Sequence, residues 1–412
     1  MLLFSHRHAF TLIELLIVIA VIAILSIVVV LTLNPAEMLR QSRDQNRLSD
    51  MDTLAHALSL YQIDQGITSN AGSLGNLNTV YVSLPDPNAT TTAGSNCASL
   101  GLPLLPAGYA YHCAGPNYYR NTNGQGWIPV NFSTITTGSP LGQLPIDPTN
   151  ASSSRLYYTY TTNGTQYEVT TSLESQKYKL GGTNDVISTD GGTLASVYEK
   201  GSKFGLEPLD YGDPSLIGLW TFDEGTGTVA YDYSGSNATG SWQGTATGTS
   251  GYYSAGRVGS WAGTFDGSTN YVAVSKITLD NNPSWTVSLW ADAPTNQLNN
   301  EGGLWSLDSN HDLQYAGGSA YIILYWGTTL VQTSTANNQW NLWTATRNGN
   351  IFSLYKNGIL AGSNSTSTTS AVSSFSIGTQ GGSRYIGLID DVRIYNRALS
   401  AAEVAALYNG GK

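Results

Sequence analysis

One carboxylate, Glu14, stands inside an otherwise apolar run that extends from Leu12 to Leu33. As a helix, this run would be about 33 Å long, enough to cross a hydrocarbon core of about 30 Å. A carboxylate near the start of such a span costs on the order of 2–3 kcal/mol if it has no partner. We therefore expect Glu14 to be a functional residue that pairs with a positive charge. The alternative is an acid tolerated close to the membrane surface.

The chain has two cysteines, Cys97 and Cys113, with fifteen residues between them in a stretch rich in Gly, Pro and Tyr. In an exported chain these would form one disulfide, worth about 3 kcal/mol if the bond acts by restricting the unfolded chain. Two unpaired buried thiols are the alternative. With only two Cys and five scattered His, the sequence has no cluster at the spacing of a zinc site.

The overall composition is polar but weakly charged. Only 11% of the 412 residues are charged and the formal net charge is −10, whereas the chain contains 45 Gly, 25 Tyr and 10 Trp. Average globular proteins have about 25% charged residues, so Ser, Thr and Asn must solvate this surface, as is typical of β-rich extracytoplasmic domains. No run of Lys or Arg occurs, which argues against nucleic acid as a partner. The length predicts two or three domains.

The elements that must position Glu14 begin with a long helix. Pro35 should kink this helix after the apolar run, and Gly66 is a plausible stop. Between them, apolar residues recur at spacings of three and four, which predicts an amphipathic stripe: Leu48, Met51, Leu54, Ala55, Leu58 and Tyr61. The charged residues are expected on the other faces, as solvated or intersubunit charges: Arg40, Arg43, Asp44, Arg47, Asp50 and Asp52.

The string from Ala9 to Ala20, AFTLIELLIVIA, resembles the class III signal of bacterial type IV pilins and type II secretion pseudopilins, and the resemblance covers residues 1–65. It implies that a prepilin peptidase cuts between Ala9 and Phe10, although the family usually has Gly before the cut. It also implies that Phe10 is then N-methylated and that the apolar helix stays on the mature protein. In the family, the acid at the position of Glu14 neutralises the terminal amine of the neighbouring subunit in the filament.

This resemblance also implies a location. The precursor, with a leader peptide of residues 1–9 and a helix over residues 10–65, would be a single-pass protein of the bacterial inner membrane. After self-assembly with other pilins, it would belong to an extracellular filament. Nucleic acid would be a partner only if that filament served DNA uptake.

Residues 66–205 are predicted to form a pilin-like head. Asn163-Gly164 lies between two β-prone runs and predicts a hairpin over residues 155–173. Upstream, residues 142–150 (GQLPIDPTN) resemble the Pro-Asp-Pro stretch of pseudopilin heads. We expect a small sheet on the helix stripe and a long loop closed by Cys97 and Cys113.

A second domain is predicted after a linker at residues 206–214. Nine of the ten Trp lie in residues 215–412, where short strands alternate with Gly- and Asn-rich turns, a pattern typical of a sandwich or jelly roll. Ser400 and Glu403 form a capping-box pattern that should open a short terminal helix. The expected strands are Leu216–Phe222, Tyr271–Ser275, Trp285–Ala291, Tyr321–Trp326, Asn341–Arg347, Ile351–Lys356, Phe375–Gly378 and Tyr385–Tyr395.

Several strings in this domain resemble the laminin-G-like, concanavalin A-like lectin/glucanase superfamily. They are GLWTFDE at residues 218–224, FDG at residues 265–267, WTVSLW at residues 285–290 and GLIDDVRIYNRALS at residues 387–400. The resemblance implies the fold and, from members that carry structural calcium, a possible calcium site at Asp223 and Asp391.

Catalysis is not predicted for this domain. Glucanases of this architecture need two carboxyl groups about 5–5.5 Å apart on one strand face. The three glutamates of the domain, Glu224, Glu301 and Glu403, are far apart in sequence, and His311 has no nucleophile motif around it. Most of the nine Trp are expected in the core, with one or two exposed as binders.

Together these patterns predict an α+β pilin, with a long N-terminal helix and a small β-sheet head, followed by an all-β jelly-roll sandwich. The hypothesis is a structural subunit of a type IV pilus-like filament whose C-terminal domain binds an extracellular glycan or protein for adhesion. The alternative is a type II secretion or DNA-uptake pseudopilin whose jelly roll contacts cargo. No cofactor is required beyond the possible calcium.

Overall fold

The structure is a computed structural model that describes residues 11–411, except residues 67–73, 107, 275, 278, 280–281, 296, 298–300, 318–319, 337 and 368–373. The side chains of residues 27–33 also lie outside the described part. The predicted leader peptide, with the cleavage site between Ala9 and Phe10 and the methylated residue Phe10, therefore lies outside the described residues.

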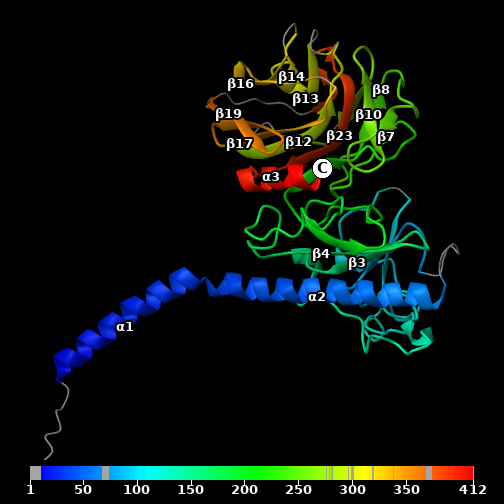
Figure 1. Cartoon of the computed structure of the whole chain (residues 1–412), viewed down its shortest axis with the longest axis vertical. Helices are drawn as coiled ribbons and strands as arrows, with labels where there is room; N and C mark the ends of the chain where they lie inside the picture. The colour runs from blue at the N-terminus through cyan, green and yellow to red at the C-terminus, as the bar shows by residue number, and fades with distance from the viewer. Residues whose placement is uncertain are drawn as a thin grey trace, which may run out of the picture.

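Two helices follow one another at the N-terminus, α1 (Leu12–Leu33) and α2 (Pro35–Asp64). Between them, Asn34 has a left-handed backbone with φ 39° and ψ 73°, and Pro35 takes the first position of α2. The chain therefore bends at the predicted position, and Figure 1 shows α1 leaving the line of α2. Within the described part of the chain, no helix is both long enough and apolar enough to span a membrane.

The head is a five-stranded sheet in the order β2-β1-β3-β4-β5, in which β1 and β2 are parallel and the other pairs are antiparallel. Three short 3₁₀ segments accompany it: Ala98–Leu100, Phe132–Thr134 and Ser152–Ser154. The strands are β1 (Thr79–Val82), β2 (Ala110–Cys113), β3 (Tyr158–Thr162), β4 (Tyr167–Ser172) and β5 (Val197–Gly201).

One face of this sheet packs on α2. The predicted apolar stripe of α2 is confirmed, because Met51, Leu54 and Leu58 are fully buried against Tyr158 and Tyr160 of β3. The prediction for two charged residues of α2 was wrong. Asp44 and Arg47 are fully buried, because Arg47 pairs with carboxylates of the head that lie far away in sequence.

The predicted hairpin forms from β3 and β4, with Thr162 opposite Tyr167. Its connection has four residues, 163–166. The Asn163 side chain accepts hydrogen bonds from the backbone N–H groups of Thr165 and Gln166, and these bonds stabilise this loop.

The other face of the head sheet is covered by the segment that the sequence suggested as a linker. Leu209, Asp210 and Tyr211 are almost completely buried. The Tyr211 hydroxyl shares a hydrogen bond of 2.9 Å with the Thr170 hydroxyl of β4. This segment is therefore part of the packing of the head and not a free tether.

The C-terminal domain is a sandwich whose described residues form two eight-stranded sheets and a two-stranded hairpin. We call the sheet that contains β12 and β23 the inner sheet and the sheet that contains β13 and β14 the outer sheet, because the inner sheet lies nearer the head (Figure 1). The fold class is confirmed: a pilin-like helix and sheet precede an all-β sandwich.

The inner sheet has the order β19-β18-β17-β12-β23-β10-β9, with β6 paired to β23. Its strands are β6 (Leu216–Trp220), β9 (Tyr253–Ala255), β10 (Trp261–Asp266), β12 (Ser284–Asp292), β17 (Asn341–Asn348), β18 (Ile351–Lys356), β19 (Ile359–Ser365) and β23 (Ile386–Tyr395).

The outer sheet has the order β16-β15-β14-β13-β20-β11-β8-β7. Its strands are β7 (Val229–Ala230), β8 (Gly240–Gln243), β11 (Tyr271–Val274), β13 (Gly302–Asp308), β14 (His311–Tyr315), β15 (Tyr321–Trp326), β16 (Thr329–Ser334) and β20 (Phe375–Ile377). The hairpin consists of β21 (Thr379–Gln380) and β22 (Ser383–Arg384).

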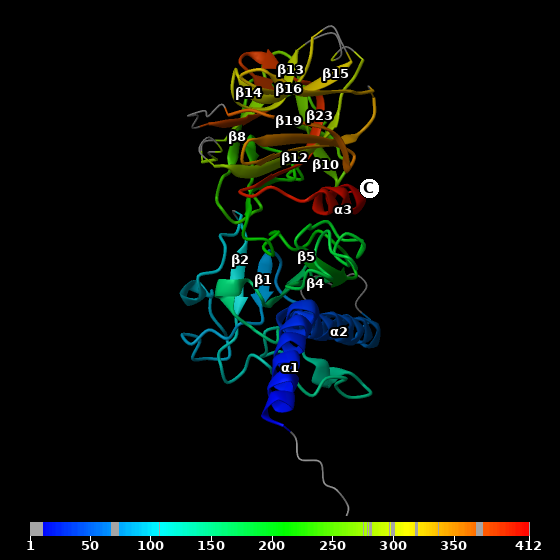
Figure 2. The ribbon, with the colours of Figure 1, turned by 90° about the vertical axis from the view of Figure 1, so that its left-hand side faces the viewer.

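The terminal helix α3 (Ala401–Gly410) begins with the predicted capping box, in which Ser400 and Glu403 exchange hydrogen bonds. It packs against the inner sheet on the side that faces the head, as Figure 2 shows. Its Tyr408 ring lies 5.6 Å from the Trp290 ring.

The tryptophans of the sandwich behave largely as expected. Trp242 is 5% exposed. Six others are at most 2% exposed: Trp220, Trp285, Trp290, Trp305, Trp326 and Trp343. Trp261 and Trp340 are partly exposed. The core between the two sheets is therefore rich in indole and phenyl rings, whereas Trp290 packs on the other side of the inner sheet, against α3.

Candidate functional site

Glu14 lies in the first turn of α1. Its carboxylate accepts hydrogen bonds from the N–H of Thr11 at 2.8 Å and from the Thr11 hydroxyl at 2.9 Å. In return, the Thr11 hydroxyl accepts from the N–H of Glu14 at 3.2 Å, which completes a capping box. In the single chain this exposed carboxylate thus caps its own helix. Its pairing with a neighbouring subunit stays a prediction.

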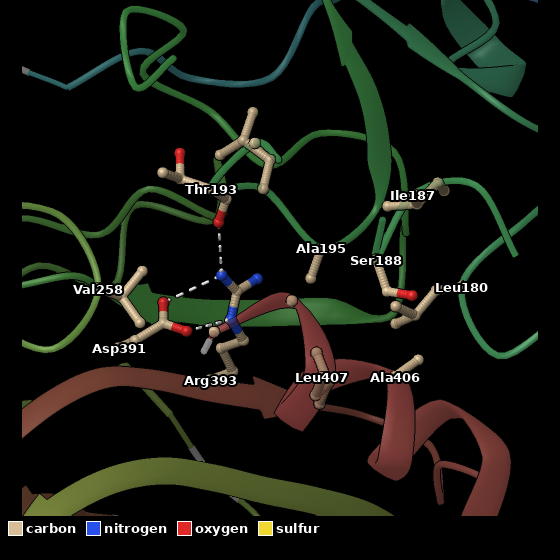
Figure 3. A pocket seen from close by; sticks show the side chains of 14 residues that line it. Leu180, Ile187, Ser188, Thr193, Ala195, Val258, Asp391, Arg393, Ala406 and Leu407 are labelled. Carbon is tan, nitrogen blue, oxygen red and sulfur yellow. Dashed lines mark hydrogen bonds and ion pairs between the residues drawn. The ribbon is translucent and has the colours of Figure 1, made fainter. Parts of the chain in front are cut away.

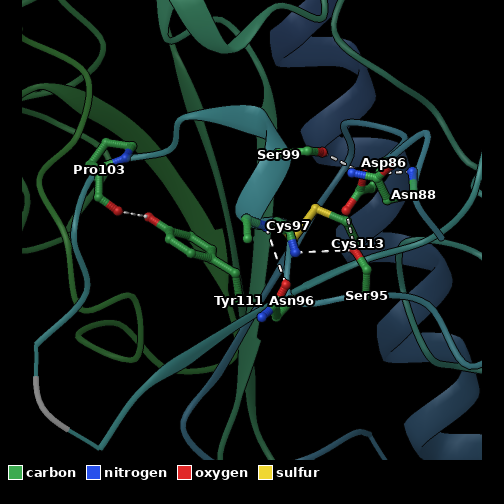
Figure 4. Close-up of a disulfide and its surroundings, with 10 residues drawn as sticks. Asp86, Asn88, Ser95, Asn96, Cys97, Ser99, Pro103, Tyr111 and Cys113 are labelled. Carbon is green, nitrogen blue, oxygen red and sulfur yellow. Dashed lines mark hydrogen bonds between the residues drawn. A yellow bond between two sulfur atoms is a disulfide. The ribbon is translucent and has the colours of Figure 1, made fainter.

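The predicted disulfide between Cys97 and Cys113 is confirmed. It joins the end of β2 to the loop before the first 3₁₀ segment, and both residues are buried (Figure 4). Next to it, the Asp86 carboxylate accepts hydrogen bonds from the hydroxyl groups of Ser95 and Ser99. The bond and this polar cluster hold the long loop of the head in one conformation.

The head and the sandwich meet at an arginine of β23, Arg393, which is 3% exposed. Its guanidinium donates to Asp210 of the head at 2.6 Å. The same group donates to the Thr193 carbonyl of the head at 3.3 Å (Figure 3). It also donates to both oxygens of Asp391, at 2.9 and 3.0 Å. A single side chain therefore ties the last long strand of the sandwich to the head.

A second arginine, Arg397, reinforces this junction. Its guanidinium donates to Asp213 at 2.7 Å, before the sandwich begins, and to Glu403 of α3 at 2.8 Å. Two cavities of about 230 and 200 Å³ lie at the junction beside these groups. The orientation of the sandwich on the head is therefore set by oriented ion pairs as well as by packing.

The structure places the two predicted calcium ligands, Asp223 and Asp391, beside the smaller of these cavities. Burial raises the pKa of Asp223, and the nearby Asp391 adds to that rise. Asp223 already accepts hydrogen bonds from the N–H groups of Ser260 and Trp261, at 2.6 and 2.9 Å.

Asp391 does not fit a calcium ligand in this arrangement, because the Arg393 guanidinium engages both of its oxygens and places a positive charge where the cation would lie. Among the described residues, no group of three acidic, His or Cys side chains is arranged to hold a metal ion. The geometry therefore does not support a calcium ion held by Asp223 and Asp391. Calcium binding at these residues stays an untested prediction.

Sequence reasoning missed a layer of buried carboxyl groups in the head. Glu168, Glu199 and Glu207 are at most 4% exposed and lie between the head sheet and the segment that covers it. The Glu168 carboxylate accepts from the N–H groups of Leu206 and Glu207, at 2.6 and 2.8 Å. A signal was present in the alternation of β4, where Tyr167 and Val169 face α2 and Glu168 must face the opposite side.

These carboxyl groups are poor acids. Burial raises the pKa of Glu207 to about 8, although the Thr159 hydroxyl that donates to it at 2.5 Å acts in the opposite direction. Asp190 adjoins the layer, since it accepts from the N–H of Glu199 at 2.8 Å, and burial raises its pKa to about 7. Burial and the adjacent Glu168 raise the pKa of Glu199 well above its ordinary value. The layer therefore holds protons at neutral pH.

Two of the three glutamates of the sandwich have structural partners. Both oxygens of Glu403 are engaged by Arg397, and Glu403 also caps α3. Glu224 accepts from the N–H of Tyr231 at 2.7 Å, and burial raises its pKa to about 7. These contacts give Glu403 a role in folding, whereas only one carboxyl oxygen of Glu224 is bonded within the described part of the chain, to the N–H of Tyr231.

Comparison with known families finds two separate matches. Residues 4–30 match the prokaryotic N-terminal methylation motif, and residues 266–405 match the concanavalin A-like lectin/glucanases superfamily. No protein with a curated description matches the chain.

Three solved structures illustrate the likeness. Domain 4 of an extracellular arabinanase from Geobacillus stearothermophilus, in complex with arabinotriose, is 22% identical over 47% of this chain and 98% of that one, with a TM-score of 0.37. The binding domain of Paraclostridial Mosquitocidal Protein 1 is 20% identical over 47% and 52%, with a TM-score of 0.38. A sialidase from Trypanosoma rangeli is 17% identical over 48% and 33%, with a TM-score of 0.37.

The chain spans about half of the second of these structures and a third of the last. The two family matches fall where the sequence placed the two resemblances. The chain therefore carries a prokaryotic N-terminal methylation motif at one end and a concanavalin A-like domain at the other, which confirms the predicted fusion.

Proposed function

We propose that this chain is a subunit of a type IV pilus-like filament that displays its C-terminal sandwich at the cell surface to bind carbohydrate. The methylation motif supports processing by a prepilin peptidase between Ala9 and Phe10, anchoring of the precursor in the inner membrane and later assembly. The concanavalin A-like domain supports the choice of ligand class. The proposed role is adhesion rather than hydrolysis, since Arg397 and the helix cap engage both carboxyl oxygens of Glu403.

One observation carries this proposal: α2 and the sandwich lie on opposite faces of the head sheet (Figures 1 and 2). Met51, Leu54 and Leu58 of α2 pack on one face, and the segment that contains Asp210 covers the other and holds Arg393. If the helices pack together at the centre of a filament, every sandwich points outward. A rigidly attached domain in that position is suited to contact with an external surface.

In the proposed filament, Glu14 neutralises the methylated amine of Phe10 on the neighbouring subunit. The carboxylate is exposed in the single chain and bonded only within its own helix end, to Thr11. Exchange of these weak exposed bonds for an ion pair in a low-dielectric filament core would favour assembly.

The test is immunogold labelling of whole cells with an antibody against residues 215–412, in cells that express the wild-type chain or Glu14→Ala. We expect label on filaments for the wild type and label confined to the cell envelope for Glu14→Ala, with Phe10 as the first residue of both by mass spectrometry. Glu301→Ala, which removes an exposed acid of the sandwich, is the matched control and should label filaments normally.

Three results would contradict parts of the proposal. Filament label that survives Glu14→Ala would refute the pairing of Glu14, and an intact Met1 would refute the processing. Wild-type label confined to the envelope, with bare filaments, would favour a secretion or DNA-uptake pseudopilin whose sandwich contacts cargo.

A further inference from the structure

The sandwich has two outward surfaces, of which the inner sheet's is already covered. Trp290, Leu342 and Tyr395 of that sheet pack against Val404 and Leu407 of α3. The same sheet reaches the head through Arg393. The outer sheet lies on the far side of the domain (Figure 1), so its outward surface is the one that a displayed domain presents.

The strand register defines which side chains lie on that surface. Successive residues of a strand point to opposite faces, and Trp242, Val272, Leu313, Leu324 and Ile377 belong to the core. The residues between them therefore point outward. The pairings align six of them in one row across six strands, which we call the outer row: Tyr325, Asp312, Ser306, Ser376, Ala273 and Ser241.

The outer row combines one aromatic ring, one acid and four small side chains. Five interstrand spacings of about 4.8 Å make it about 24 Å long, which is the length of an oligosaccharide rather than of a single sugar. The adjacent row of the same face holds larger side chains. In it, Gln314 lies opposite Ile323, and Tyr271 lies opposite Gln243. The Arg384 guanidinium lies 4.3 Å from the centre of the Tyr271 ring.

Asp312 is the residue of the outer row that the fold does not explain. It is fully buried, and neither of its carboxyl oxygens has a hydrogen-bond partner among the described residues. The amide oxygen of Gln314 is also buried and unpartnered. Burial raises the pKa of Asp312 to about 8, while the nearby Gln380 amide, which donates to the Ser309 carbonyl at 3.0 Å, acts in the opposite direction.

Buried polar groups without partners cost free energy, so each one in a native protein calls for an explanation, such as a functional role or an ordered water. A carboxyl group and an amide oxygen that lack donors suit the hydroxyl groups of a sugar. A tyrosine ring at the end of the row suits the apolar face of a pyranose or furanose ring. The serine hydroxyls along the row add groups that both donate and accept.

We infer that the outer row is the saccharide-binding site of this chain, and that it takes a neutral, hydroxyl-rich oligosaccharide lying across the strands. This inference rests on the proposed carbohydrate-binding function and adds to it the site and the ligand class. Because the Asp312 oxygens are closed to solvent, neighbouring side chains such as Gln380 must rotate when the sugar binds.

The test uses the full chain in detergent micelles and an array of immobilised gluco-, xylo-, arabino- and galacto-oligosaccharides. Ser376→Tyr places a ring across the outer row at a partly exposed position, and we expect it to reduce retention by the best oligosaccharide at least tenfold. Ser363→Tyr is the matched control, since it makes the same change at an exposed position of β19 in the inner sheet and should bind like the wild type.

A second variant, Asp312→Asn, separates binding from folding. It removes a carboxyl group that is costly to bury while keeping its shape, so we expect a higher melting temperature together with weaker oligosaccharide retention. Wild-type retention by both Ser376→Tyr and Asp312→Asn would overturn the site and leave carbohydrate binding elsewhere on the chain intact. If the wild type retains no oligosaccharide, the proposed carbohydrate function falls, and the site falls with it.

Discussion

The pilin-like head and the sandwich are held together by different forces. In the head, the fully buried Arg47 of α2 donates to Asp147 at 2.6 Å and to Asp44 at 2.7 Å, and the neighbouring Arg43 reaches Glu174 at 2.6 Å. In the sandwich, the core consists of packed rings such as Trp285, Trp305 and Trp326.

The two regions should therefore respond differently to substitutions and to changes in pH. Ion pairs in a dry interior depend on geometry and on protonation, and removing one partner leaves the others unpaired. Hydrophobic burial is not directional and depends little on pH. Charge substitutions and changes in pH should therefore damage the head first and leave the sandwich as an internal reference. Nine of the ten tryptophans report on the sandwich, so fluorescence follows that region almost alone.

The largest change is expected from pH, because several buried carboxyl groups of the head titrate in one layer. The pKa of Glu207 is raised to about 8 and that of Asp190 to about 7. Since these values lie above the ordinary ones, the stabilisation is complete below about pH 4 and is lost as the pH rises toward 8. We expect hydrogen exchange in β4 and β5, corrected for the intrinsic rate, to accelerate between pH 5 and pH 9.

The sandwich also contains buried acids with raised pKa values, such as Glu224 at about 7 and Asp312 at about 8, but they are scattered over separate strands and loops. Exchange in β17, which carries no carboxyl group, should therefore change less over the same range. Glu207→Gln should weaken the dependence of hydrogen exchange in the head on pH. An equal acceleration in β5 and β17 would show that the two regions do not differ in this way.

The next largest effect is expected from Arg47→Met. The substitution leaves Asp44 and Asp147 buried without their cation, which costs about 3–5 kcal/mol of unfolding free energy. Urea denaturation followed by hydrogen exchange in α2 measures this loss. The control is Arg40→Met, whose side chain is 46% exposed and makes only a 3.6 Å pair with Glu37. If Arg47→Met lowered the free energy of unfolding by less than about 1 kcal/mol, the ion pairs of Arg47 would be no stronger than ordinary surface pairs.

Removal of the disulfide by the double substitution Cys97→Ala and Cys113→Ala should cost about 3 kcal/mol, because the unfolded chain regains the freedom of the closed loop. The loss should appear in the head, where the loop packs, and the fluorescence transition of the sandwich should stay in place. A shift of the fluorescence transition instead would mean that the two regions unfold as one cooperative unit.

The smallest effect is expected from Arg393→Met, about 2 kcal/mol of coupling between head and sandwich. Asp210 would keep the hydrogen bonds from the N–H groups of Ala195 and Ser196, both at 2.9 Å, which limits the loss. Small-angle scattering and protease cleavage within residues 203–214 should reveal a looser junction. Lys276→Met, at an exposed position of the sandwich, should leave both unchanged. Unchanged cleavage of Arg393→Met would show that packing alone sets the junction.

The sequence by itself determined the features that depend on neighbouring residues. A continuous apolar run predicted α1, and apolar periodicity predicted the buried stripe of α2. Pro35 marked the bend, and Asn163-Gly164 marked a hairpin. Ser400 and Glu403 predicted the start of α3. Each of these signals acts over a few residues, where helix and turn geometry fix the spacing of the side chains.

Only the tertiary structure decided which charges are buried, which face of the sandwich is free and how the two regions join. Arg47 meets Asp147 across 100 positions of sequence, and Arg393 meets Asp210 across 183. The outer row likewise exists only once six strands from β8 to β20 have taken their register. Pairings over such distances depend on the packing of whole sheets, and no local spacing encodes them.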